Sequence, residues 1–74
     1  MCLPSGSIYL YSKDGTGGNI CMIDLSSKDE FIEELKYLFT KCGYEIDKYD
    51  YACYVDEDNF TIYKVNVSRE TLGL

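Results

Sequence analysis

The sequence predicts an α+β domain in which a mostly antiparallel four-stranded sheet carries one helix packed on one face, in the order ββαββ. One segment repeats its apolar residues at helical spacing, and four segments alternate apolar with polar residues. Two hairpins and a helix bury their apolar faces by packing on one another. Seventy-four residues suit a single domain over 1–74, with residues 1–6 and 68–74 as tails.

The first hairpin is predicted as strands 7–12 and 19–25 joined by a turn. The turn contains Asp-Gly and two further glycines, which supply positive φ at low steric cost. Because these glycines run into a strand and not into a helix, they do not match a phosphate-binding loop. The apolar positions expected on one face of these strands are Ile8, Leu10, Cys21, Ile23 and Leu25.

The helix is predicted over 27–42. Ser27 followed by Glu30 matches a capping box, and Gly43 supplies a residue that ends a helix in the left-handed conformation. Asp29 and Glu30 in the first turn and Lys41 in the last complement the helix dipole. The apolar stripe that packs on the sheet is expected to comprise Phe31, Ile32, Leu35, Leu38, Phe39 and Cys42.

The second hairpin is predicted as strands 49–55 and 60–67 around an acidic turn at 56–59. The apolar pattern of the last strand changes phase, so we expect a β-bulge near 62–63. The tail at 68–74 is expected to be pinned by Leu72 and Leu74.

The side-chain alternation also predicts which residues are buried. Three of the four cysteines fall on faces expected to point inward, where reduced thiols pack as small hydrophobes; they are Cys21, Cys42 and Cys53. The sheet face that the helix leaves uncovered is expected to show Tyr9, Tyr11 and Tyr54. Such an aromatic face favours a dimer or partner interface.

Composition argues against an enzyme and against direct binding to nucleic acid or membranes. The net charge is −6, which repels both, and the chain has no histidine to act as a general base. No nucleophile–base pair, cysteine pair or calcium-loop pattern is present, so we expect no catalytic residue, no cofactor and no metal site. No signal peptide or membrane-spanning run is recognisable, which predicts a cytoplasmic protein.

The acidity is concentrated in one segment. Residues 44–58 carry six carboxylates against one lysine, whereas the remaining 59 residues carry seven acids and six bases. Acids interleaved with tyrosines favour a surface for Arg- and Lys-rich partners, and a solvated connector is the alternative interpretation. The candidate partner-binding residues in this segment are Glu45, Asp47, Tyr49, Asp50, Asp56, Glu57 and Asp58.

The outer side of the helix is a second candidate surface. Helical winding places Tyr37 opposite the apolar stripe, close to three carboxylates. An exposed aromatic residue in such a setting is either a contact residue or an ordinary surface tyrosine. The partner-binding candidates on this face are Glu30, Glu33, Glu34 and Tyr37.

In size, acidity, aromatic content and sheet-plus-helix plan, the chain resembles the small acidic inhibitors encoded by bacteriophages and mobile elements, including anti-CRISPR proteins and DNA mimics. The resemblance implies a non-enzymatic inhibitor in the host cytoplasm. Its acidic, tyrosine-rich surface would occupy a basic, nucleic-acid-binding site on a host defence protein such as a CRISPR-Cas effector. The alternatives are a small adaptor or oligomerisation module that forms a homodimer through its tyrosine-bearing sheet face, and an antitoxin-like neutraliser.

Overall fold

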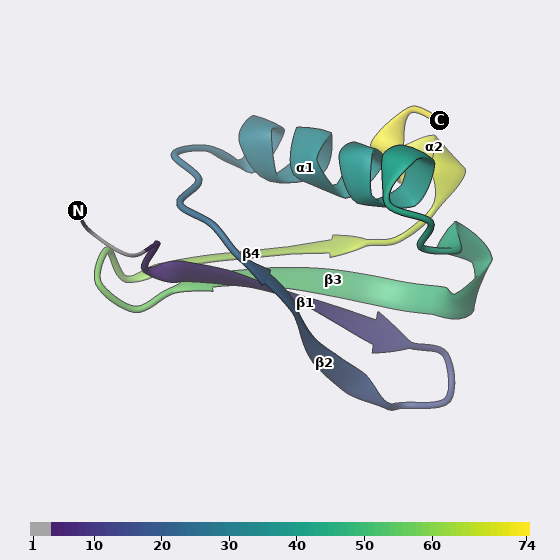
Figure 1. Cartoon of the computed structure of the whole chain (residues 1–74), viewed down its shortest axis with the longest axis horizontal. Helices are drawn as coiled ribbons and strands as arrows, with labels where there is room; N and C mark the ends of the chain where they lie inside the picture. Colours follow the sequence, from purple (N-terminus) through teal and green to yellow (C-terminus); the bar gives the residue numbers. More distant parts are fainter. Residues whose placement is uncertain (1–3) are drawn as a thin grey trace.

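The computed structural model describes residues 4–74 and confirms the α+β fold with a four-stranded antiparallel sheet. Both helices lie on the same side of the sheet, and α2 lies beside the C-terminal half of α1 (Figure 1). The strand order is β2-β1-β3-β4, so the two hairpins meet where β1 pairs with β3. The elements are β1 (Gly6–Ser12), β2 (Gly17–Met22), α1 (Lys28–Lys41), the 3-10 turn η1 (Ile46–Lys48), β3 (Tyr49–Asp56), β4 (Thr61–Asn66) and α2 (Arg69–Leu72).

Helix α1 begins and ends where the sequence predicts. The Ser27 hydroxyl accepts a hydrogen bond from the Glu30 backbone N–H at 3.2 Å, and Gly43 has a φ of 82°. The Glu30 carboxylate accepts from the Ser26 hydroxyl, so the return half of the capping box goes to the preceding residue. Cys42 is the C-cap and is exposed, so its predicted inward placement is wrong. The apolar stripe stops short of Cys42 because that residue has already left the helical conformation.

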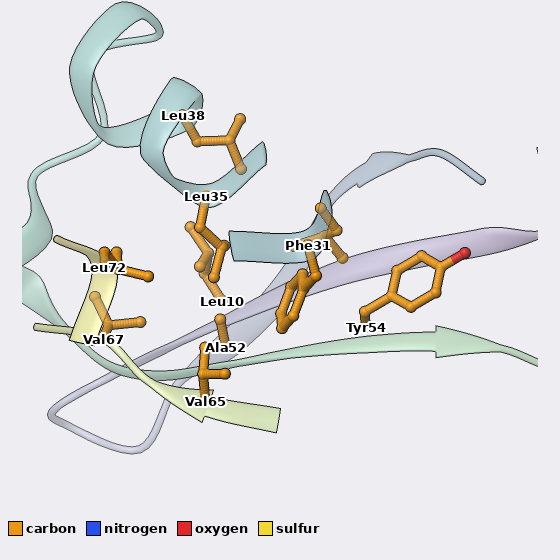
Figure 2. Packing of buried hydrophobic residues seen from close by; sticks show 10 residues of the cluster. Leu10, Phe31, Leu35, Leu38, Ala52, Tyr54, Val65, Val67 and Leu72 are labelled. Carbon is orange, nitrogen blue, oxygen red and sulfur yellow. The ribbon is translucent and has the colours of Figure 1, made fainter. Parts of the chain in front are cut away.

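The core lies between α1 and the middle of the sheet. Phe31, Leu35 and Leu38 point from the helix toward strand residues that include Leu10 and Ala52 (Figure 2). The C-terminal segment forms α2, which the sequence did not predict as a helix; Leu72 is buried in the same cluster, whereas Leu74 is exposed. Of the two leucines expected to pin the tail, only Leu72 does so.

Strand β3 has the opposite facing to the one predicted. Ala52 and Tyr54 face the helix and are fully buried, whereas Cys53 is half-buried on the other face. The predicted inward placement of Cys53 and outward placement of Tyr54 are therefore wrong. The cause is a polar anchor for the Tyr54 hydroxyl, which accepts from the Leu25 backbone N–H at 2.9 Å and donates to Asp56 at 3.3 Å.

Strand β4 contains no bulge at the predicted position. Its ladder with β3 is continuous from Tyr51↔Asn66 to Asp56↔Thr61. The register shifts lie in β1, between Ile8 and Tyr9 against β2 and between Tyr11 and Ser12 against β3. The phase change in the sequence has another origin: Ile62 is an apolar residue that lies on the sheet face away from the helix and is 72% exposed.

Candidate functional site

The acidic segment does not form one surface. Glu45, Asp47 and Asp50 form a first acidic group that precedes or begins β3. Asp56, Glu57 and Asp58 form a second group that ends or follows β3. The extended chain advances roughly 3.3 Å per residue, so Asp50 and Glu57, seven residues apart, lie about 23 Å apart. Strand β3 therefore carries the two acidic groups to opposite ends of the sheet.

The first acidic group is largely neutralised by the chain's own basic residues. Glu45 forms an ion pair with Lys48 at 3.3 Å. Both carboxylate oxygens of Asp47 contact the Arg69 guanidinium, at 2.8 and 3.3 Å, and these hydrogen bonds lower the pKa of Asp47. Tyr49 is half-buried, with its ring centroid 5.9 Å from that of Phe39. Asp50 is exposed and forms no ion pair among the described residues.

The second acidic group contains a structural residue. Asp56, which the sequence places in an exposed turn, is only 1% exposed, and that expectation is wrong. Its carboxylate accepts from the backbone N–H groups of Asp58 and Asn59 at 3.1 and 3.2 Å, and from the Asn59 side-chain amide at 2.9 Å. It also accepts from the Ser5 hydroxyl at 3.0 Å. Hydrogen bonding, with the Asn59 side chain as the largest cause, lowers the pKa of Asp56.

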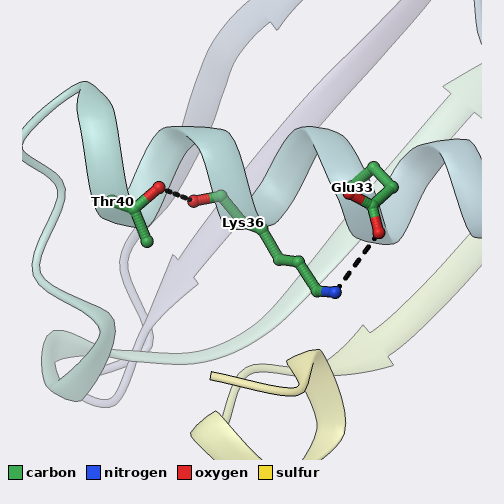
Figure 3. A network of polar contacts seen from close by, with 3 residues as sticks. All are labelled: Glu33, Lys36 and Thr40. Atoms are coloured by element: carbon green, nitrogen blue, oxygen red, sulfur yellow. Dashed lines mark hydrogen bonds and ion pairs between the residues drawn. The ribbon is translucent and has the colours of Figure 1, made fainter.

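The acids on the outer side of α1 do lie together. Glu30, Glu33, Glu34 and Tyr37 follow helical spacing, and Tyr37 is 54% exposed. Lys36 donates to Glu33 at 3.2 Å, and the Thr40 hydroxyl donates to the Lys36 carbonyl (Figure 3). This face is thus a mixed-charge helix surface, and an exposed ion pair of this kind contributes little free energy.

The sheet face opposite α1 differs from the rest of the surface. No described helix or loop covers it, and strand pairing arranges its residues in three rows of four. We call these residues the uncovered face. The rows, each written from β2 to β4, are Met22–Ser7–Val55–Ile62, Asn19–Tyr9–Cys53–Lys64 and Gly17–Tyr11–Tyr51–Asn66.

One end of the uncovered face is held by aromatic packing. Tyr11 and Tyr51 stack with their ring centroids 4.5 Å apart and their planes 11° apart. Lys64 Nζ lies 4.5 Å from the Tyr51 centroid, a cation–π contact. A Cβ on Gly17 would overlap the Tyr11 ring, so the glycine gives that ring its place on the sheet. These contacts fix the orientation of two tyrosine side chains before any partner binds.

The other end of the uncovered face is apolar and open. Met22 is 59% exposed and Ile62 is 72% exposed, at the two edges of one row. The turn that joins β3 to β4 carries Phe60, which is 93% exposed and has a φ of 54°. A left-handed conformation is uncommon for a large side chain, and strained residues concentrate at functional positions.

The charges avoid the uncovered face. Among its described residues there is no Asp or Glu, although the chain has thirteen, and Lys64 is its one charged side chain. Desolvation raises the pKa of the Cys53 thiol, which keeps that thiol protonated and weakly nucleophilic at neutral pH. This arrangement suits binding to an apolar or aromatic surface.

Sequence reasoning missed Met22, Tyr51, Phe60 and Ile62. The phase change in the fourth strand was a signal for Ile62, because an apolar residue out of phase with Tyr63 and Val65 belongs to the other face. No local signal distinguished the two faces of the third strand.

The described residues contain no group of three or more acids or cysteines arranged to hold a metal ion. A shallow depression lined by Ser12, Lys13, Asp14 and Lys48 lies at the turn between β1 and β2. No helix in the described part of the chain is long and apolar enough to cross a membrane. Comparison of the chain with protein-family models, with curated proteins and with solved structures found no match to any of them.

Proposed function

We propose that this chain is a non-enzymatic protein-binding module that docks through the uncovered face of its sheet. The observation that carries the proposal is the segregation of charge. The face presents tyrosines and aliphatic side chains without a carboxylate, on a chain whose net charge is −6. Contiguous apolar patches rimmed by polar residues are typical of protein interaction sites.

The composition of the face agrees with an interface core. Such cores are depleted in charged residues and enriched in Tyr, Phe and Met. The Tyr11–Tyr51 stack supplies a pre-oriented aromatic surface, and Met22 and Ile62 supply exposed aliphatic area beside it. Little conformational entropy is lost at the stacked end on binding, because its rings are already packed.

Cys53 provides a direct test, because it lies in the middle row of the uncovered face while Cys42 lies at the end of α1. The protein is alkylated in the cells that express it, and labelling of each cysteine is read by peptide mass spectrometry. The ratio of Cys53 to Cys42 labelling is compared with the ratio in dilute purified protein. We expect the ratio to fall in cells and to be restored by Ile62→Lys.

Thr40→Lys is the matched control, because it adds the same charge at an exposed position of α1, on the opposite side of the sheet. It should leave the Cys53 labelling ratio low in cells. Equal ratios in cells and in dilute protein would contradict docking on this face.

An inhibitor that competes with nucleic acid for a basic host protein is a second candidate function. It is favoured by Glu57 and Asp58, which are exposed and form no ion pair among the described residues, beside the exposed Phe60. A DNA mimic requires a continuous row of carboxylates. The described residues do not form such a row, because β3 separates the two acidic groups, and this argues against the second candidate. For this candidate, Glu57→Lys with Asp58→Lys should abolish binding to a basic partner, and added nucleic acid should displace the unaltered protein.

A further inference from the structure

We propose that the occupant of the uncovered face is a second copy of this chain, related to the first by a two-fold axis parallel to the strands. This inference rests on the proposed docking function and names its partner. Two sheets that pack face to face lie about 10 Å apart with strands nearly aligned, as in a β-sandwich.

Charge favours this way of pairing two copies. Each copy carries −6, and the acids lie on the helices, in the loops and turns, and near the ends of β3. The uncovered face is a surface on which two copies meet without opposing carboxylates, because its described residues include none. Like charges opposed across an interface cost several kcal/mol, so this feature selects the face.

The composition of the rows selects the axis. A two-fold axis along the strands lays β4 of one copy over β2 of the other. Each row of one copy then faces the same row of the second copy. The exposed Ile62 then meets Met22 of the second copy, and Lys64 meets Asn19. An axis across the strands would instead lay β4 over β4 and bring the two Lys64 ammonium groups together.

The same pairing also brings the aromatic residues of the two copies into contact. Tyr11 of one copy lies over Tyr51 of the other, so the two stacked pairs face each other and extend one aromatic layer. The middle row brings Tyr9 over Cys53, an aromatic ring over a protonated thiol. An isologous interface makes every such contact twice.

The area of the face corresponds to a small interface. Three rows at about 6.6 Å and four strands at about 4.8 Å give a footprint of roughly 400 Å² per copy, or about 800 Å² in both. The exposed Phe60 rings adjoin the first row and offer about 150–250 Å² each. The total lies near the lower limit of about 1,000–1,200 Å² for a specific interface, so we expect a reversible dimer with micromolar affinity.

The test is sedimentation velocity of the purified, reduced chain over a range from low micromolar to millimolar concentration. The variants are Met22→Glu, Ile62→Lys and both together in one chain. Met22 and Ile62 of one copy lie on opposite edge strands, about 14 Å apart at roughly 4.8 Å per strand, so they form no ion pair within the chain. Across the proposed axis they are neighbours.

We expect each single variant to weaken self-association at least about tenfold, because it places a charge opposite an apolar side chain. The double variant should recover most of that loss through two Glu–Lys pairs across the interface. Thr40→Glu and Thr40→Lys, which change net charge by the same amounts at an exposed position of α1, should leave the dimer unchanged.

A chain that stays monomeric at millimolar concentration would overturn the proposal. A double variant that self-associates no more tightly than the single variants would overturn the proposed axis. If the purified chain is monomeric while Cys53 is still protected in cells, a different protein occupies the face, and the docking function stands without the dimer.

Discussion

The Tyr54 hydroxyl occupies the space that a side chain at position 6 would need, because a Cβ on Gly6 would overlap Tyr54 Oη. Gly6 lies on β1 opposite Asp56, two residues along the strand from the pair Ile8↔Tyr54. The missing side chain at Gly6 leaves room for the buried tyrosine ring. Together with the hydrogen bonds of the Tyr54 hydroxyl, this close approach favours the facing of β3 and therefore the composition of the uncovered face.

Gly6→Ala should destabilise the fold. The added methyl group displaces the Tyr54 ring from its hydrogen bonds with Leu25 and Asp56, and overpacking of this kind costs roughly 1–3 kcal/mol. Chemical denaturation of the variant measures the free energy of unfolding. The matched control is Gly18→Ala, because a Cβ at Gly18 meets nothing within 4 Å.

In that control, the loss of chain entropy in the unfolded state should leave stability unchanged or raise it by up to about 1 kcal/mol. An equal effect of the two substitutions would show that the packing of Tyr54 against Gly6 does not determine the facing of β3.

The stability of the fold should fall in acid. The pKa values of Asp24 and Asp56 are lowered: that of Asp24 chiefly by a hydrogen bond from the Ser5 backbone N–H, and that of Asp56 chiefly by the Asn59 side chain. A carboxyl with a lowered pKa in the folded state binds protons more tightly in the unfolded state. Its contribution is therefore complete above the unfolded pKa of about 3.9 and is lost as pH falls through the lower folded value.

The melting temperature, measured at neutral pH and in steps below about pH 4, tests this expectation. Asp56→Asn should lower the melting temperature at neutral pH and flatten its acid dependence, since the remaining acid sensitivity comes from Asp24 and the other hydrogen-bonded acids. Asp58→Asn is the control, because its carboxylate accepts no hydrogen bond from any residue in the described range 4–74. An acid dependence that Asp56→Asn leaves intact would remove Asp56 as its source.

Leu35→Ala should strongly destabilise the fold. Leu35 is fully buried between the helix and the sheet, and a leucine-to-alanine cavity costs roughly 2–5 kcal/mol. In a domain of this size that loss is a large part of the total stability. Leu74→Ala, at an exposed leucine outside the core cluster, should change the free energy of unfolding by less than about 0.5 kcal/mol.

Local signals were enough to predict the order of the major elements. Helix α1 begins at the Ser27 hydroxyl cap and ends before the left-handed Gly43. Both signals act within a few residues of chain, so the sequence displays them directly. The facing of β3 depends on partners far along the chain: Gly6 and Leu25, which lie 48 and 29 residues from Tyr54. Alternation in β3 could not show which face packs on the helix, because both faces carry apolar and aromatic residues.

The candidate site was harder to predict for a related reason. Carboxylates that are neighbours in the sequence lose that proximity when an extended strand runs between them, and Asp56 is drawn inside by the turn it organises. The residues of the uncovered face come from four separate strands, so only the pairing register assembles them. The expectation of a tyrosine-bearing sheet face held for Tyr9 and Tyr11, with Tyr51 in the place given to Tyr54.

Phe60 should separate stability from binding. Its φ of 54° costs a phenylalanine roughly 1 kcal/mol relative to a residue that adopts the left-handed conformation freely, and its ring is 93% exposed. Phe60→Gly should therefore leave the free energy of unfolding unchanged or raise it, by up to about 1 kcal/mol, since strain relief is opposed by the entropy of glycine in the unfolded chain. The same variant should weaken self-association, because it removes apolar area beside the row of Met22 and Ile62.

Chemical denaturation and sedimentation of one variant measure both effects. A Phe60→Gly chain that self-associates as tightly as the unaltered chain would show that the ring takes no part in the dimer.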